Sequence, residues 1–121
     1  MVVSHKDIYL AMNNIMSFYK HFNLNLPLYV HDDGSLTSRD KKILKSKVPF
    51  AQIVSRQEAY NRIYKIIYGY SYIHALRSSW QGLKLVDIPL LASSKKVIIM
   101  DSDLFFFDCP TEIKDWVLDK V

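Results

Sequence analysis

Cysteine, glycine and proline are scarce in this sequence of 121 residues. The single cysteine, Cys109, excludes an internal disulfide, which is typical of proteins in a reducing compartment. Three glycines and four prolines argue against a low-complexity or linker-like chain. Because half of the residues are hydrophobic, the composition favours a packed core, and the length suits one small domain over residues 1–121.

Long apolar segments are also missing. No run approaches the roughly 20 apolar residues that a membrane-spanning helix needs. The first residues have no basic region followed by an apolar run, so they do not resemble a signal peptide. The net charge of +4 is spread thinly along the chain. Its densest basic stretch, Arg39 to Lys47, is interpreted as the solvated face of a helix, with a site for anionic lipid or nucleic acid as the alternative.

Periodicity and turn residues predict an alternating order of helices and strands. Apolar residues at spacings of three and four from Ile8 to Phe22 predict the first helix. The other expected elements are a first strand of which Val2-Val3 is the stub, strands over 26–31, 50–54 and 95–100, a helix from Thr37 or Ser38 to about 45, a helix from about 56, and helices over 83–92 and 110–118. Gly69 and Gly82 are expected to break the helical middle. This order favours an α/β layer fold with a largely parallel sheet.

Tyrosines recur every four residues in the helical middle of the chain, and they are Tyr60, Tyr64, Tyr68 and Tyr72. Such a ladder suits stacking on sugars, but aromatic side chains at helical spacing more often pack against their neighbours. We therefore expect packing, beside a buried stripe that consists of Ala59, Ile63, Ile66 and Ile67.

Two acidic clusters come directly after predicted strands. Asp101-Ser102-Asp103 lies between the apolar runs Val97–Met100 and Leu104–Phe107, where two unpaired charges would be costly to bury. A divalent cation removes that cost, because carboxylate oxygens are ligands that Mg²⁺ and Mn²⁺ prefer. The alternative is a turn with two solvated aspartates.

The second cluster, Asp32-Asp33-Gly34-Ser35, has the composition of an ordinary turn. Its functional interpretation is a carboxylate that accepts hydrogen bonds from a nucleobase or ribose. In open α/β sheets ligands bind at the carboxyl ends of the strands, so both clusters are expected to reach one crevice.

Four segments together resemble glycosyltransferases of the GT-A type. Leu28-Tyr-Val-His-Asp-Asp-Gly-Ser-Leu is similar to the segment after the first helix of those enzymes. Lys84-Leu-Val-Asp-Ile-Pro-Leu-Leu and Lys95-Lys-Val-Ile-Ile-Met-Asp-Ser-Asp-Leu resemble the approach to their Asp-x-Asp motif, and Phe106-Phe107-Asp-Cys-Pro-Thr-Glu-Ile resembles the segment on its C-terminal side. The resemblance covers nearly the whole chain and implies a Rossmann-like nucleotide-sugar-binding fold, of which the chain is a truncated, N-terminal portion.

The resemblance implies an enzyme of the hexosyltransferase kind that transfers sugar from a nucleoside-diphosphate sugar, with a UDP-sugar as the first expectation. It implies that Asp101 and Asp103 bind Mn²⁺ or Mg²⁺ and that Asp32 or Asp33, with Asp33 preferred, contacts the nucleoside. Lys84 is expected near the phosphate or sugar, and Asp87 near the sugar. The acceptor, whether glycan, lipid-linked or protein, is not identified, and no catalytic base is found. A cytoplasmic location, at or near a membrane surface, and no nucleic-acid partner are expected.

Other interpretations remain open. A non-catalytic or degenerate glycosyltransferase-like module would keep the fold and bind nucleotide weakly or not at all. A phosphatase of the haloacid-dehalogenase type also has an Asp-x-Asp after an aliphatic strand, but its nucleophile lies early in the chain. A phosphoacceptor receiver domain places its acidic residues at the first and third strands, a spacing that this sequence does not match.

Overall fold

A computed structural model describes residues 1–120 as a small α/β fold built on a parallel sheet. Its strands, in chain order and in order across the sheet, are β1 (Val2–Val3), β2 (Leu28–Asp32) and β3 (Ala51–Val54). The predicted α/β class, the parallel sheet and the short first strand are therefore confirmed. Residue pairs Val2–His31 and Leu28–Ala51 define the register of the two ladders.

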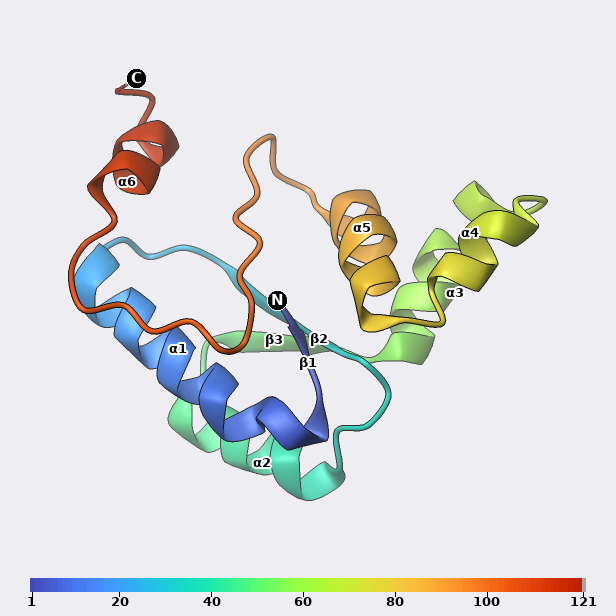
Figure 1. Ribbon diagram of the computed structural model, residues 1–121, viewed down its shortest axis with the longest axis horizontal. Helices are drawn as coiled ribbons and strands as arrows, with labels where there is room; N and C mark the ends of the chain where they lie inside the picture. Colours follow the sequence, from blue (N-terminus) through green and yellow to red (C-terminus); the bar gives the residue numbers. More distant parts are fainter. Residues whose placement is uncertain (121) are drawn as a thin grey trace.

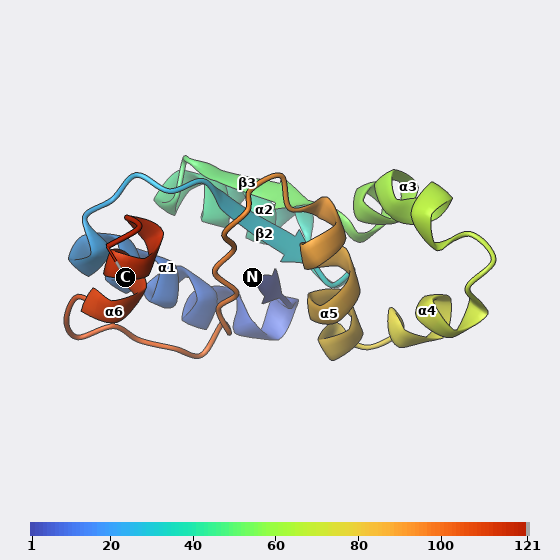
Figure 2. The same ribbon diagram turned by 90° about the horizontal axis from the view of Figure 1, so that it is seen from above.

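The helices are a 3₁₀ turn over His5–Asp7, α1 (Ile8–Phe22), α2 (Ser38–Lys47), α3 (Arg56–Ile67), α4 (Ser71–Leu76), α5 (Trp80–Leu91) and α6 (Thr111–Val117). Figure 1 shows α1 and α2 together on one side of the sheet and α5 on the other. Figure 2, the view from above, shows α3 and α4 at one end of the molecule and α6 at the other. Among residues 1–120, no helix has the length and apolarity required to cross a bilayer.

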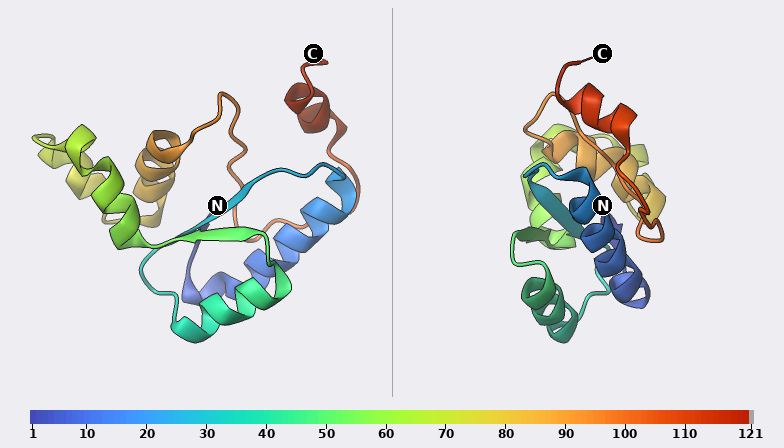
Figure 3. Two further views of the ribbon diagram at one scale, coloured as in Figure 1. Left: turned by 180° about the vertical axis from the view of Figure 1, so that it is seen from behind. Right: turned by 90° about the vertical axis from the view of Figure 1, so that its left-hand side faces the viewer.

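The two faces of the sheet are buried against different helices because side chains alternate along a strand. Leu28 and Val30 join the main core, which α1 completes with Ile15, Phe18 and Phe22. Figure 3 shows, from two further directions, α1 and α2 next to the sheet whose face they cover. On the opposite face, Val2 packs against Leu83 and Ile88 of α5.

Local sequence explains where the first helices begin and end. The apolar stripe of α1 is buried at Ile8 and Ile15. The helix ends at Phe22 and is followed by Asn23, whose φ of 53° is the left-handed conformation typical of a helix terminus. At α2, the Thr37 hydroxyl accepts from the Asp40 backbone N–H while the Asp40 carboxylate accepts from the backbone N–H of Thr37. This reciprocal pair satisfies two backbone donors that a helix start leaves free.

The predicted strand over 95–100 is wrong. The segment Lys95–Met100 has no regular secondary structure and forms no ladder with the described strands (Figure 1). Ile98 and Met100 point into the core, whereas Val97 and Ile99 stay 40% and 46% exposed. A strand of a parallel sheet needs cover on both faces, and this segment has cover on one.

Two expectations for the helical middle also need correction. Gly82 lies inside α5 and breaks nothing; a Cβ there would lie 1.7 Å from the backbone oxygen of Leu76, so glycine permits the close packing of α4 on α5. Ile66 is 56% exposed and does not belong to the buried stripe, which contains Ile63 and Ile67. Gly69, with φ of 87°, does end the helical run, as predicted.

Candidate functional site

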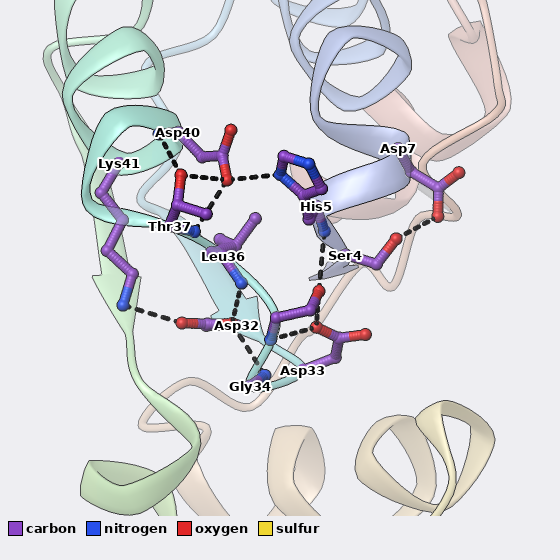
Figure 4. A network of polar contacts seen from close by, with 11 residues as sticks. Ser4, His5, Asp7, Asp32, Asp33, Gly34, Leu36, Thr37, Asp40 and Lys41 are labelled. Atoms are coloured by element: carbon purple, nitrogen blue, oxygen red, sulfur yellow. Dashed lines mark hydrogen bonds and ion pairs between the residues drawn. The ribbon is translucent and has the colours of Figure 1, made fainter.

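The loop after β2 is fixed by the carboxylate of Asp32. One of its oxygens accepts hydrogen bonds from the backbone N–H groups of Gly34 (2.7 Å) and Leu36 (3.1 Å), and the other lies 2.8 Å from the Lys41 ammonium. Figure 4 shows these contacts at the end of the strand. Because Asp32 is buried and both of its oxygens are engaged, its role is to hold the loop in shape.

Asp33 lies differently in the same loop. Its Oδ1 accepts from the backbone N–H of Ser35 (2.9 Å) and from the Ser35 hydroxyl (2.6 Å) (Figure 4). Its Oδ2 contacts no partner among residues 1–120, and the side chain is partly exposed. Of the two aspartates, Asp33 is therefore the one with a carboxylate oxygen that has no hydrogen-bond partner among residues 1–120. The expected contact of Asp33 with a nucleoside stays a prediction.

A second set of polar contacts connects this loop to the 3₁₀ turn before α1 and to α2. The Ser35 hydroxyl accepts from the backbone N–H of His5 (2.8 Å), and the His5 ring nitrogen Nδ1 lies 2.7 Å from Asp40 Oδ2 (Figure 4). Hydrogen bonds from Thr37 and then from His5 lower the pKa of Asp40 to about 2. The loop after β2 is thus held from both neighbouring helices.

Arg56, the first residue of α3, connects the loop after β2 to the turn before α5. Its guanidinium donates to the backbone oxygens of Asp33 (3.1 Å) and Arg77 (2.7 Å). A Cβ at Gly34 would lie 3.3 Å from Arg56 Cδ, and the φ of Gly34 is +102°. The close approach of Arg56 and the backbone conformation therefore both favour glycine at this position. A pocket of about 360 Å³ opens here, lined from the β2 loop and α3, with Tyr60 and Arg77 on its wall.

Asp87 is bound to a buried arginine. Its two oxygens accept from Arg77 Nε (2.6 Å) and Nη2 (2.8 Å), and both residues are buried. The Arg77 guanidinium also lies 5.0 Å from the centre of the Tyr60 ring. The predicted contact of Asp87 with a sugar remains a prediction, but in this structure both of its oxygens are used to fix α5 to the turn that precedes it.

Lys84, one turn before Asp87 on α5, lies at the Asp-x-Asp motif. Its ammonium forms an ion pair with Asp101, and the charge of Asp103 acts on it as well. Burial lowers the pKa of Lys84, and Asp103 opposes that shift. The ammonium lies 4.2 Å from the centre of the Trp80 ring. Three of the residues predicted from the sequence are therefore brought together.

The motif itself is supported by side chains of α1. The Asn14 amide donates to the backbone oxygen of Asp101, and the backbone N–H of Phe106 donates to the Ser17 hydroxyl at 3.0 Å. The carboxylates of Asp101 and Asp103 are exposed. The segment is thus tethered on either side of two carboxylates that face outward.

Polar contacts and one turn of α5 connect the two acidic clusters. Asp33 is bound to Arg56, Arg56 to Arg77 and Arg77 to Asp87, which shares a helix with Lys84. Since Lys84 is paired with Asp101, both clusters lie along one connected region. A crevice that both clusters reach stays a prediction, and the motif follows a segment that is not a strand.

The donor groups at the motif suit a hard cation only in part. Within residues 1–120, no three His, Cys, Asp or Glu side chains gather as a ready-made metal site. Asp101 and Asp103 provide carboxylate oxygens alone, which suits Mg²⁺ or Mn²⁺, because such ions often take one or two carboxylates and complete their ligands with water and phosphate. The Lys84 ammonium already places a positive charge beside both carboxylates, at the position that a cation would take.

Sequence reasoning missed Arg56 and Arg77. Arg56 comes soon after β3, and its position after a strand was a usable signal. For Arg77 the sequence contains no such signal, because the pairing of Arg77 with Asp87 depends on the packing of α4 on α5.

No protein-family model matches this chain, and no curated protein or solved structure is significantly similar to it.

Proposed function

We propose that the carboxyl edge of the sheet binds a nucleoside-diphosphate sugar, in a protein of the GT-A glycosyltransferase type. The observation that carries the proposal is Lys84, an ammonium between α5 and the Asp101-Ser102-Asp103 motif, joined through Asp87, Arg77 and Arg56 to the loop of Asp33. A diphosphate sugar has a nucleoside at one end and charged phosphates in the middle. The acceptor oxygen of Asp33 and the motif offer complementary groups at the two ends of this region.

Each residue has a distinct task in the proposed complex. Asp33 accepts a hydrogen bond from the nucleobase or ribose through its free Oδ2, while Asp32 keeps the loop in place. Asp101 and Asp103 would hold Mn²⁺ or Mg²⁺, which when bound neutralises charge on the diphosphate. Lys84 donates to a phosphate oxygen, for which its ammonium has only to turn away from Asp101.

The transfer would break the bond between the anomeric carbon and the phosphate oxygen and form a bond from that carbon to an acceptor hydroxyl oxygen. The electron pair of the broken bond leaves with the diphosphate, and the hydroxyl proton passes to a base. Lys84 stabilises the negative charge on the leaving diphosphate, which is the usual place for an enzyme to apply a fixed positive charge. We assign no residue as the base.

Calorimetric titration with UDP, and then with the other nucleoside diphosphates, in the presence and absence of Mn²⁺ tests the donor site. We expect binding that requires Mn²⁺ and that Asp103→Ala abolishes. Asp115→Ala on α6 is the matched control, because its side chain lies on another element and should leave binding unchanged. A folded sample that binds no nucleotide with Mn²⁺ would contradict the proposal.

A binding module without transferase activity is the second candidate, and the pairing of Lys84 with Asp101 favours it, because that ion pair must open before a cation can use Asp101. The two candidates differ in one measurement. A transferase slowly hydrolyses its donor in the absence of an acceptor and releases free sugar, whereas a binding module leaves the donor intact at saturation.

A further inference from the structure

The tip formed by the end of α3, the turn at Gly69 and the start of α4 exposes an unusual set of side chains. Tyr68, Tyr70 and Tyr72 are 70%, 61% and 72% exposed. Tyr64 and Ile66, on the last turn of α3, are 38% and 56% exposed. We call these five residues and Lys65 the aromatic tip. Clusters of large exposed apolar side chains on a folded protein mark contact surfaces, whereas single ones do not.

Packing within the fold does not account for the aromatic tip. The inner side of α3 is filled by Ile63 and Ile67, which pack on Val86 of α5. Tyr64 packs edge-on against Tyr68, with ring centres 5.6 Å apart. The tyrosines of the predicted ladder on α3 contact one another, Tyr60 with Tyr64 and Tyr64 with Tyr68. The prediction that they are packed is wrong for Tyr68 and Tyr72, which are 70% and 72% exposed, because no other described element covers this end of α3 and α4.

The charge on and around the aromatic tip is mainly positive. From Ala59 to Val86 the sequence contains no Asp or Glu, while it contains Arg62, Lys65, Arg77 and Lys84. Arg77 is buried in its ion pair, but Lys65 is exposed at the tip. The side chain of Arg62 is 51% exposed one turn away, with the exposed carboxylate of Glu58 4.0 Å from it. A surface on which exposed cations outnumber carboxylates attracts an anionic partner.

The shape and composition of the tip distinguish between two kinds of partner, a sugar and a membrane surface. Figure 2 shows α3 and α4 projecting at one end of the molecule, and Figure 3 shows the same projection from behind. A sugar site needs amide or carboxylate groups placed around its aromatic ring to fix the hydroxyls. Between Tyr64 and Ile73 the sequence has no Asn, Gln, Asp or Glu. A projecting tip of tyrosines, an isoleucine and a lysine has instead the composition of a membrane-interface anchor.

We propose that the aromatic tip docks on the headgroup region of a membrane that contains anionic lipid. The tyrosine rings lie at the boundary of headgroups and acyl chains, and Lys65 and Arg62 contact lipid phosphates. Docking at the tip brings the pocket beside Tyr60, about one helical turn from Tyr64, close to the membrane surface. This proposal does not depend on the donor site and can hold or fail without it.

Flotation with phosphatidylcholine vesicles, with and without phosphatidylglycerol, tests the docking. We expect the chain to float with the anionic vesicles and to be released by high salt. Tyr70→Ser/Tyr72→Ser should weaken binding by roughly tenfold or more, because two exposed rings are lost. Lys65→Gln should weaken binding by about fivefold.

The matched control is Tyr9→Ser/Phe107→Ser, which removes two aromatic rings that are 62% and 85% exposed on other parts of the surface. This control should bind as the wild type does, and circular dichroism should show all variants folded. Equal binding of the tip variant and the control variant would overturn the proposal, as would wild-type protein that does not float. Binding of a soluble oligosaccharide that depends on Tyr70 and Tyr72, without vesicle binding, would also overturn it and assign the tip to carbohydrate.

Discussion

His31 should make the stability of this protein fall between neutral and mildly acidic pH. The residue lies on β2 with 6% of its surface exposed, and its Nδ1 has no hydrogen-bond partner among residues 1–120. It lines an apolar pocket of about 250 Å³ between the sheet, the end of α5 and the segment after that helix. Burial, and then the nearby positive charges of the chain terminus and Arg62, lower the pKa of His31 to about 4, although Asp87 opposes the shift.

The direction of the effect is set by proton binding. In the unfolded chain the imidazole of His31 takes up a proton as the pH falls through about 6.5, whereas in the folded chain it does so only near pH 4. Between these values the unfolded state binds more protons, so the free energy of unfolding decreases as the pH falls. A difference of this size corresponds to at most about 3 kcal/mol, a large part of the 5–15 kcal/mol typical of a folded domain.

Urea unfolding followed by circular dichroism at intervals from about pH 7 to pH 4 measures the slope, and NMR titration of the imidazole C–H measures the pKa itself. His31→Gln should remove this part of the slope, while His21→Gln should keep it. The difference between wild type and His31→Gln isolates His31 from the carboxylates that titrate near pH 4. A His31 midpoint near 6.5 by NMR, or equal slopes in the two proteins, would refute the reasoning.

Three further predictions concern single contacts. Asp87→Asn leaves the buried Arg77 charge without its charged partner and should lower the free energy of unfolding by about 3–5 kcal/mol, measured by urea unfolding. In the same assay Glu58→Gln, which removes an exposed ion pair, should change the free energy of unfolding by less than about 1 kcal/mol. Gly82→Ala places a Cβ 1.7 Å from a backbone oxygen of α4 and should cost about 1–3 kcal/mol, measured as a lower thermal midpoint, and an unchanged midpoint would contradict this packing. Thr37→Ala removes the cap of α2 and should cost about 1 kcal/mol in the same assay, with Thr37→Ser expected to recover most of it.

The sequence predicted best those elements whose signal is local. The apolar stripe from Ile8 to Phe22 appears as α1, and the turn residues after β2 appear as the loop that Asp32 fixes. Each of these depends on residues a few positions apart. A helix period or a turn can therefore be predicted without knowing what packs on it.

The prediction failed where distant segments decide the outcome. Val97–Met100 has the composition of a buried strand, but whether it pairs depends on a neighbouring strand and on cover for its second face. The prediction that Gly82 breaks a helix failed because the role of this glycine depends on the close approach of Leu76, which the sequence does not reveal. The binding of Asp87 by Arg77 likewise results from tertiary packing and leaves no pattern in the sequence.

The tether of the motif segment to α1 has a consequence for how that segment moves. Backbone amides inside β2 are bonded on both sides and exchange with solvent only when the sheet opens, while those of Val97–Met100 form no ladder and are free to exchange through small excursions. Asn14 and Ser17 bind the segment at two points, near Asp101 and Phe106. The two carboxylates therefore lie on a short span anchored at both ends, and they can change position without disturbing the sheet.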